Sequence, residues 1–241
     1  MTTSVLVGSD KRPLTVFTAV ALPVGWVLLS IPLFVDVPVE PFVLGTLYLG
    51  LVLPTILLAG RTSVRRLLID TVRPPRPIWL LIPAAALIPV VAGLLSGASL
   101  LTFGFVNVLS SLLIVNLWEE MAWAGFVQRR AADRWGYVGG SVVTALLFTG
   151  IHLPLAFYGT HGLGDISYNV AVMIVSAIGL RLLIGAFDVW GRGSILTLAL
   201  IHATFNATGD LLDPGHAWVR YAVTLGLGLG AALVVRGRSA R

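Results

Sequence analysis

The sequence predicts an all-α membrane protein that crosses the bilayer about eight times, and three observations lead to this fold class. The 241-residue chain is 57% hydrophobic and only 11% charged, whereas soluble domains average about 25% charged residues. Its apolar residues fall into runs long enough to span a bilayer. Its basic residues gather in the short connections between those runs, as is typical of a polytopic membrane protein.

The expected spans follow from the bilayer core, which is about 30 Å thick and requires roughly 20 apolar residues per helix. They are residues 14–35, 41–60, 77–97, 101–127, 138–158, 166–188, 193–210 and 217–235. The first run is too long for a cleaved signal peptide, so we interpret it as a signal anchor. Without a soluble domain or an internal repeat in the sequence, residues 1–241 are expected to form a single integral-membrane domain.

The orientation is predicted from the connections. Arginines are concentrated in residues 61–76, 128–136 and 236–241, whereas the connections DVPVE, SGAS, GTHGLGD and DLLDPGH contain no Lys or Arg. Basic loops stay in the cytoplasm, so both termini are expected there, in a multi-pass protein of the cell (inner or plasma) membrane. The same distribution makes the lipid bilayer, and not nucleic acid, the partner that explains the net charge of +5.

Strongly polar side chains inside the spans are few, and three helices place theirs near one depth. Glu119 lies ten residues before Arg129, roughly 15 Å from the cytoplasmic boundary at 1.5 Å per residue. His202 and His152 lie roughly 13 Å and 18–21 Å deep on the same rise. Because ionisable groups at such depth are costly and usually functional, we expect an intramembrane active site.

The spacing within the helices supports one shared site. His202 and Asn206 are four residues apart and so share a helix face, as do Phe148 and His152. Glu119 and its neighbour Glu120 differ by about 100°, so one can face a reaction centre while the other meets a supporting partner.

Simpler interpretations exist for each residue taken alone. A single membrane His or Asn, such as Asn116, commonly joins helices by hydrogen bonds, and adjacent glutamates also suit a proton or cation site in a transporter. His161 and His216 lie in outside loops and are expected to be solvated, and Trp123 and Phe126 are expected to serve in packing.

The set as a whole suits hydrolysis. A carboxylate in an apolar site can act as a general base toward water, and a neutral imidazole can hold that water or protonate a leaving amine. A second His with an Asn carboxamide supplies neutral donors for an oxyanion. There is no cysteine, no Ser-His-Asp order and no His-Glu-x-x-His, so the usual serine, cysteine and zinc mechanisms are not indicated.

Three motifs in order resemble the CAAX protease and bacteriocin-processing (CPBP) family of intramembrane proteases, which includes the type II CAAX prenyl endopeptidases. They are EEMAWAGF, FTGIH and HATFN, which correspond to the family patterns Glu-Glu-x-x-x-Arg, Phe-x-x-x-His and His-x-x-x-Asn. The motifs fall within residues 103–212. The resemblance implies an eight-helix intramembrane endopeptidase whose substrate is a peptide or a membrane protein.

The resemblance also implies roles for individual residues. Glu119 would activate the hydrolytic water with help from His152, His202 and Asn206 would stabilise the oxyanion, and Glu120 would support the site structurally. The family has been described both as metalloproteases and as glutamate-dependent proteases. No cofactor is expected, and zinc, which would use Glu119, His152 and His202, is the less favoured alternative.

One motif position departs from the family pattern, because Ala124 stands where the first motif has its arginine. Arg181 lies at nearly the depth of Glu120, roughly 11 Å against roughly 13 Å from the cytoplasmic boundary. We therefore expect Arg181 to supply the missing cation from another helix. The alternative is that it extends to the lipid headgroups or pairs with Asp188.

Two other functions compete with the enzyme. A proton-coupled transporter would be expected to show repeat symmetry, and none is visible. A non-catalytic relative, acting in immunity or as a scaffold, would be expected to have lost part of the motif set, and none of Glu119, His152, His202 and Asn206 is lost. The sequence does not indicate the substrate, the cleavage site or the oligomeric state.

Overall fold

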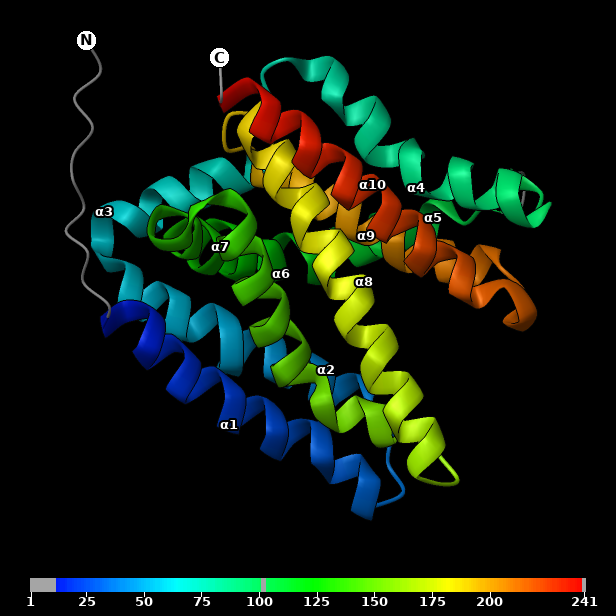
Figure 1. The fold of residues 1–241 in the computed structure, drawn as a ribbon. Coiled ribbons are helices and arrows are strands. Elements are labelled where there is room, and N and C mark those ends of the chain that lie inside the picture. The colour runs from blue at the N-terminus through cyan, green and yellow to red at the C-terminus, as the bar shows by residue number, and fades with distance from the viewer. Residues whose placement is uncertain (1–11, 101–102, 240–241) are drawn as a thin grey trace, which may run out of the picture.

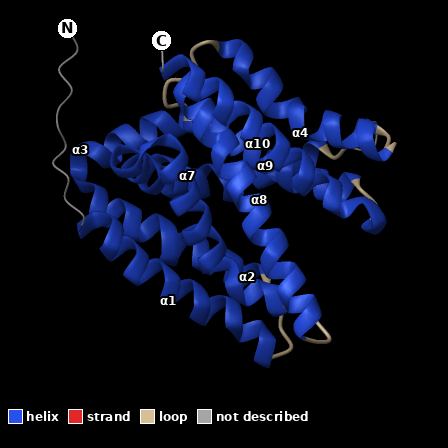
Figure 2. Ribbon diagram, viewed as in Figure 1, coloured by secondary structure: helices blue, strands red, loops and turns tan. Residues whose placement is uncertain are grey.

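The computed structural model describes residues 12–100 and 103–239, and over these residues the chain is helical without a strand (Figures 1 and 2). The all-α class is confirmed. Residues 1–11, 101–102 and 240–241 of the expected domain, including the start of the span predicted at 101–127, lie outside the described residues.

The helices follow one another with short connections. The first half contains α1 Arg12–Phe34, α2 Glu40–Gly45, the π-helix η1 Thr46–Val52, α3 Leu53–Val72, the 3-10 helix η2 Ile78–Leu80 and α4 Leu81–Ser96. The central part contains α5 Phe105–Ser111, the π-helix η4 Leu112–Asn116, α6 Leu117–Glu120, the π-helix η5 Met121–Gln128, α7 Arg129–His152 and the 3-10 helix η6 Leu153–Phe157. The last part contains α8 Leu163–Trp190, α9 Ile195–Leu211, the 3-10 helix η7 Pro214–His216 and α10 Ala217–Ser239.

Two glycines break otherwise continuous helices. Gly60 in α3 has φ 73° and ψ 159°, and Gly136 in α7 has φ 73° and ψ 172°, which is backbone that only glycine adopts without strain. Gly60 is the last residue of the span predicted at 41–60, and Gly136 is the last residue of the arginine-rich connection 128–136, just before the span predicted at 138–158.

Six helical stretches of the described chain are long and apolar enough to cross a membrane, so the number eight is not confirmed. One of the six, Phe105–Phe157, is 53 residues long and contains the break at Gly136, where the sequence predicts two separate spans. Helix α9 has 17 residues and is not among the six. A multi-pass helical protein is therefore established, and the count of eight stays a prediction.

Helix α8 packs against α7 and α10 (Figure 1), and its buried apolar residues share a core cluster with residues of α4, α9 and α10. A Cβ atom at Gly179 of α8 would lie 2.6 Å from the backbone of Leu225 in α10, so these helices approach as closely as glycine permits. On the other side of the molecule Trp123 packs edge to face on Phe17 of α1, with ring centroids 5.8 Å apart. Trp123 and Phe126 are both buried, which confirms their predicted role in packing.

Candidate active site

The two glutamates lie on α6, a single α-helical turn between the π-helices η4 and η5. A π-helix carries more residues per turn than an α-helix and is frequent at functional sites, so the flanking segments turn the glutamates relative to a regular helix. Glu119 is 7% exposed and Glu120 is fully buried. As the angular offset predicts, the two carboxylates have different surroundings.

Glu120 is held by an arginine from another helix. Arg181 of α8 donates two hydrogen bonds to its carboxylate, from Nη1 to Oε2 at 2.6 Å and from Nη2 to Oε1 at 2.8 Å, and both side chains are 0% exposed. This bidentate geometry is the strongest form of an ion pair. Asp188, the alternative partner, instead bonds Arg129 at 2.8 Å. The predicted pairing of Arg181 with Glu120 is therefore confirmed.

The packing around this pair is consistent with the small residue in the first motif. Ala124 is 2% exposed and belongs to the same core cluster as Leu180 and Ile184, which flank Arg181 on α8. The guanidinium carbon of Arg181 lies 4.6 Å from the centroid of the Phe148 ring. The ion pair is thus enclosed by apolar side chains from three helices.

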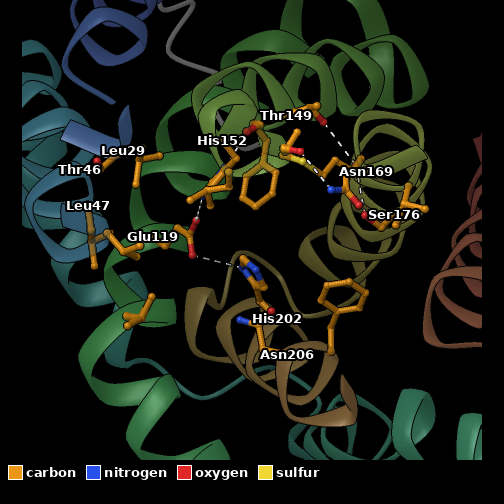
Figure 3. Close-up of a pocket in the computed structure, with 18 of the residues that line it drawn as sticks. Leu29, Thr46, Leu47, Glu119, Thr149, His152, Asn169, Ser176, His202 and Asn206 are labelled. Atoms are coloured by element: carbon orange, nitrogen blue, oxygen red, sulfur yellow. Dashed lines mark hydrogen bonds and ion pairs between the residues drawn. The ribbon is translucent and has the colours of Figure 1, made fainter. Parts of the chain in front are cut away.

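Glu119 faces the two histidines across short gaps (Figure 3). Its Oε1 lies 3.9 Å from Nε2 of His152, and its Oε2 lies 3.8 Å from Nδ1 of His202. Both distances exceed that of a direct hydrogen bond. The predicted meeting of three helices at one level is confirmed.

The hydrogen bonds of the histidines determine which ring nitrogens face Glu119. Nδ1 of His152 lies 2.7 Å from the carbonyl oxygen of Phe148; since a carbonyl only accepts, Nδ1 carries the proton and the neutral ring offers its Nε2 lone pair to the cavity. Nδ1 of His202 lies 2.6 Å from Oε1 of Glu120 and likewise donates, because that carboxylate already accepts from Arg181. His202 thereby joins the two glutamates.

These groups open onto a cavity of about 580 Å³. Asn206, one turn beyond His202 on α9, also lines it, whereas Glu120 does not. Its walls are largely apolar, with Leu47, Leu51 and Val172 among them, and its polar residues include Thr149, Asn169, Ser176 and Arg220. Figure 3 shows Asn169 and Ser176 across the open space from Glu119.

The structure adds two polar residues to the cavity that the sequence analysis did not predict, and it leaves other polar residues outside the cavity. Arg220 and Asn169 were missed because each lies in the first two turns of its helix, where polar residues normally meet the interface. Asn116 is buried and accepts a 2.7 Å hydrogen bond from Ser111 without lining the cavity. His161 and His216 are exposed, as predicted.

The fit of the site to a metal can be judged from its donor atoms. Nδ1 of both histidines is engaged, with Phe148 or with Glu120. In the described parts of the chain, no group of three or more His, Cys, Asp and Glu side chains has the arrangement of a metal site. A metal-binding His commonly donates its other ring nitrogen to a carbonyl or a carboxylate, so these two bonds do not decide between the alternatives. The expected absence of a cofactor stays a prediction.

Comparison with known proteins identifies one region. The family model described as "Type II CAAX prenyl endopeptidase Rce1-like" matches residues 101–208. No curated protein matches the chain by sequence. The matched region contains Glu119, Glu120, His152, His202 and Asn206, and it ends before Arg220.

Proposed function

We propose, from its membership of the CAAX protease family through residues 101–208, that the chain is an intramembrane endopeptidase that hydrolyses a peptide bond with a water activated by Glu119. One observation carries the proposal: the carboxylate of Glu119 faces His152 and His202 across gaps of 3.9 and 3.8 Å at the edge of a 580 Å³ cavity. The groups that hydrolysis requires thus surround a space large enough for a peptide.

The attacking water would lie between Glu119 and His152. Both the carboxylate and the Nε2 lone pair accept hydrogen bonds, so a water there donates one hydrogen to each and turns its own lone pair toward the cavity. When its oxygen attacks the peptide carbonyl carbon, Glu119 takes the proton and returns it to the leaving nitrogen as the C–N bond breaks. The products are a carboxylic acid and an amine.

His202 and Asn206 are proposed to stabilise the oxyanion. Because Nδ1 of His202 already donates to Glu120, its Nε2 can donate to an oxyanion only when the ring is doubly protonated. This differs from the neutral donor expected from the sequence, and the Asn206 amide is the neutral donor that remains.

Glu120 and Arg181 are proposed to position this ring. The bidentate ion pair fixes the carboxylate, and the carboxylate fixes Nδ1 of His202 at 2.6 Å. Neither residue lines the cavity, so they act through His202 and do not touch the substrate.

We further propose eight spans with both termini in the cytoplasm, as the sequence predicts. The break at Gly136 supports two spans within Phe105–Phe157. Three connections meet at one end of the molecule, because Arg129 bonds Asp70, Asp188 and the carbonyl of Gly193. These include the arginine-rich segment 61–76, which supports a common cytoplasmic end.

The experiment that tests the function compares membrane-proteome cleavage products from cells that express the wild-type chain or Glu119→Gln. Peptide termini produced only with the wild type support an endopeptidase and identify its substrates. Identical sets of termini, with both proteins present at equal levels, would contradict it.

A further inference from the structure

We propose that Arg220 binds a carboxylate of the substrate inside the catalytic cavity, and so selects peptides with a negative charge two or three residues from the bond that is cut. This inference rests on the proposed peptidase function and adds a substrate class to it. Arg220 lies outside the three motifs and outside the matched region.

Arg220 lines the same cavity as Glu119, His152 and His202. It belongs to the first turn of α10, three residues after Ala217. Its neighbours in the cavity wall are Phe205, Asn206 and Tyr221. The guanidinium is thus the cationic group that a bound peptide would meet on the α9 and α10 side.

The hydrogen bonds of Arg220 leave its charge without a counter-ion. Nη2 donates to the hydroxyl of Tyr221 at 2.6 Å, Nη1 lies 3.5 Å from the carbonyl of Asn206, and the buried Nε has no partner. Among the described residues no carboxylate lies within ion-pair distance of Arg220, whereas Arg181 bonds one and Arg129 bonds two. A partly buried charge without a partner is unfavourable, and an anionic ligand would remove that cost.

The guanidinium is held in place before any ligand arrives. It lies 4.7 Å from the ring centroid of Tyr221 and 5.4 Å from that of Phe205, which are favourable cation–π distances. A Cβ atom at Gly209 would overlap Nη1 of Arg220, so the group lies directly against the α9 backbone. A planar guanidinium with a fixed orientation is suited to bidentate binding of a carboxylate.

The position along α9 gives the expected distance from the reaction. The guanidinium contacts α9 between Asn206 and Gly209, four to seven residues beyond His202, which corresponds to roughly 6–10 Å of helix. An extended peptide advances about 3.3 Å per residue. A carboxylate two or three residues from the scissile bond would therefore reach Arg220.

The test is cleavage-site profiling with the full-length protein in nanodiscs. The library consists of ten-residue peptides that are apolar except at one randomised position, which includes Asp, Glu, Lys and Arg and is moved along the peptide. It is supplied in two forms, with a free C-terminal carboxylate and with a C-terminal amide, and products are sequenced by mass spectrometry. The wild type is compared with Arg220→Gln, Arg220→Glu and the control Arg134→Gln. Arg134 also lies over an aromatic ring, 4.6 Å from that of Trp135, but outside the catalytic cavity.

The wild type and Arg134→Gln are expected to enrich a carboxylate at least about tenfold, the ratio for roughly 1.4 kcal/mol, two or three residues from the cut. Arg220→Gln should lose the enrichment while still cleaving neutral peptides, and Arg220→Glu should favour Lys or Arg there. If only free-acid peptides are enriched, the carboxylate is the C-terminus; if Asp and Glu are enriched in both forms, it is a side chain.

An enrichment that persists in Arg220→Gln, or cleavage by the wild type without any charge preference, overturns the inference and leaves the peptidase function standing. Loss of co-purifying phosphatidylglycerol from Arg220→Gln, without a change in profile, would assign the arginine to a lipid headgroup and also overturns it. If the wild type cleaves nothing, the peptidase function fails. In that case a binding assay decides the role of Arg220, with Glu119→Gln and Glu119→Gln/Arg220→Gln each immobilised. Arg220 binds the carboxylate if Glu119→Gln retains acidic peptides better than neutral ones and the double variant does not; equal retention by both proteins overturns the inference.

Discussion

Removing Arg181 tests whether the cation of the first motif has moved to α8. In Arg181→Ala, the Glu120 carboxylate stays in a site with 0% exposure and keeps only the 2.6 Å contact with His202. Breaking one side of a buried ion pair costs about 3–5 kcal/mol. At about 2–4 °C per kcal/mol for a chain of this size, the thermal midpoint in detergent should fall by roughly 6–20 °C.

A second substitution, Ala124→Arg, tests whether Arg181 replaces the arginine of the first motif or only contributes to packing. Residue 124 lies four positions after Glu120, on the same face of the chain, and Arg181→Ala vacates the space that a longer side chain at 124 would need. The double variant Ala124→Arg/Arg181→Ala should recover roughly half or more of the lost stability on the scale set by the buried pair, and should recover hydrolysis with it.

The matched control is Arg129→Ala, which also breaks an ion pair, with Asp188 at 2.8 Å and Asp70 at 3.1 Å. Adding Ala124→Arg to that variant should restore nothing. The reasoning is refuted if Arg181→Ala leaves the midpoint unchanged, if the double variant is no better than the single, or if the control is rescued equally.

Three further predictions concern topology, packing and metal dependence. In the cysteine-free chain, a cysteine at Ser63 should be shielded from an impermeant reagent in intact cells while one at Thr160 is labelled; labelling at Ser63 would overturn the orientation. Gly179→Ala should destabilise the protein by about 1–3 kcal/mol through overpacking, because its Cβ would lie 2.6 Å from α10. Gly226→Ala, which meets open space, should be neutral or stabilising in the same thermal melt, and equal losses would contradict the close crossing. Hydrolysis should survive 1,10-phenanthroline and EDTA, and a loss that added Zn²⁺ reverses would favour the zinc alternative.

The helical class and the convergence of the motifs were predictable from the sequence. Polar side chains are costly inside a bilayer, so the few that lie in apolar runs mark a site. Glu119, His152 and His202 stand out in apolar runs, and a constant helical rise turns their positions into depths. The pairing of Arg181 with Glu120 was one of two open alternatives, favoured because both are expensive to bury alone and lie at nearly one level, and the structure decides for it.

Three features of the site could not be predicted from the sequence, because they depend on local helix geometry and on contacts between helices. The π-helices around α6 add a residue to a turn, and nothing in EEMAWAGF distinguishes them from α-helix. Arg220 lies near the end of a span, where an arginine normally extends to the headgroups, so only the fold shows that it lines the cavity. The ring of His202 is oriented by Glu120 from another helix, which sequence spacing cannot show.

The central claim, that Glu119 activates the hydrolytic water, is tested most directly by the turnover of purified Glu119→Gln in proteoliposomes, with Glu40→Gln, an exposed glutamate outside the cavity, as the control. The amide is nearly isosteric with the carboxylate but cannot take a proton. Hydrolysis should fall by at least about a hundredfold, with an unchanged thermal midpoint and with full activity in Glu40→Gln. Near-normal turnover by Glu119→Gln would contradict the account.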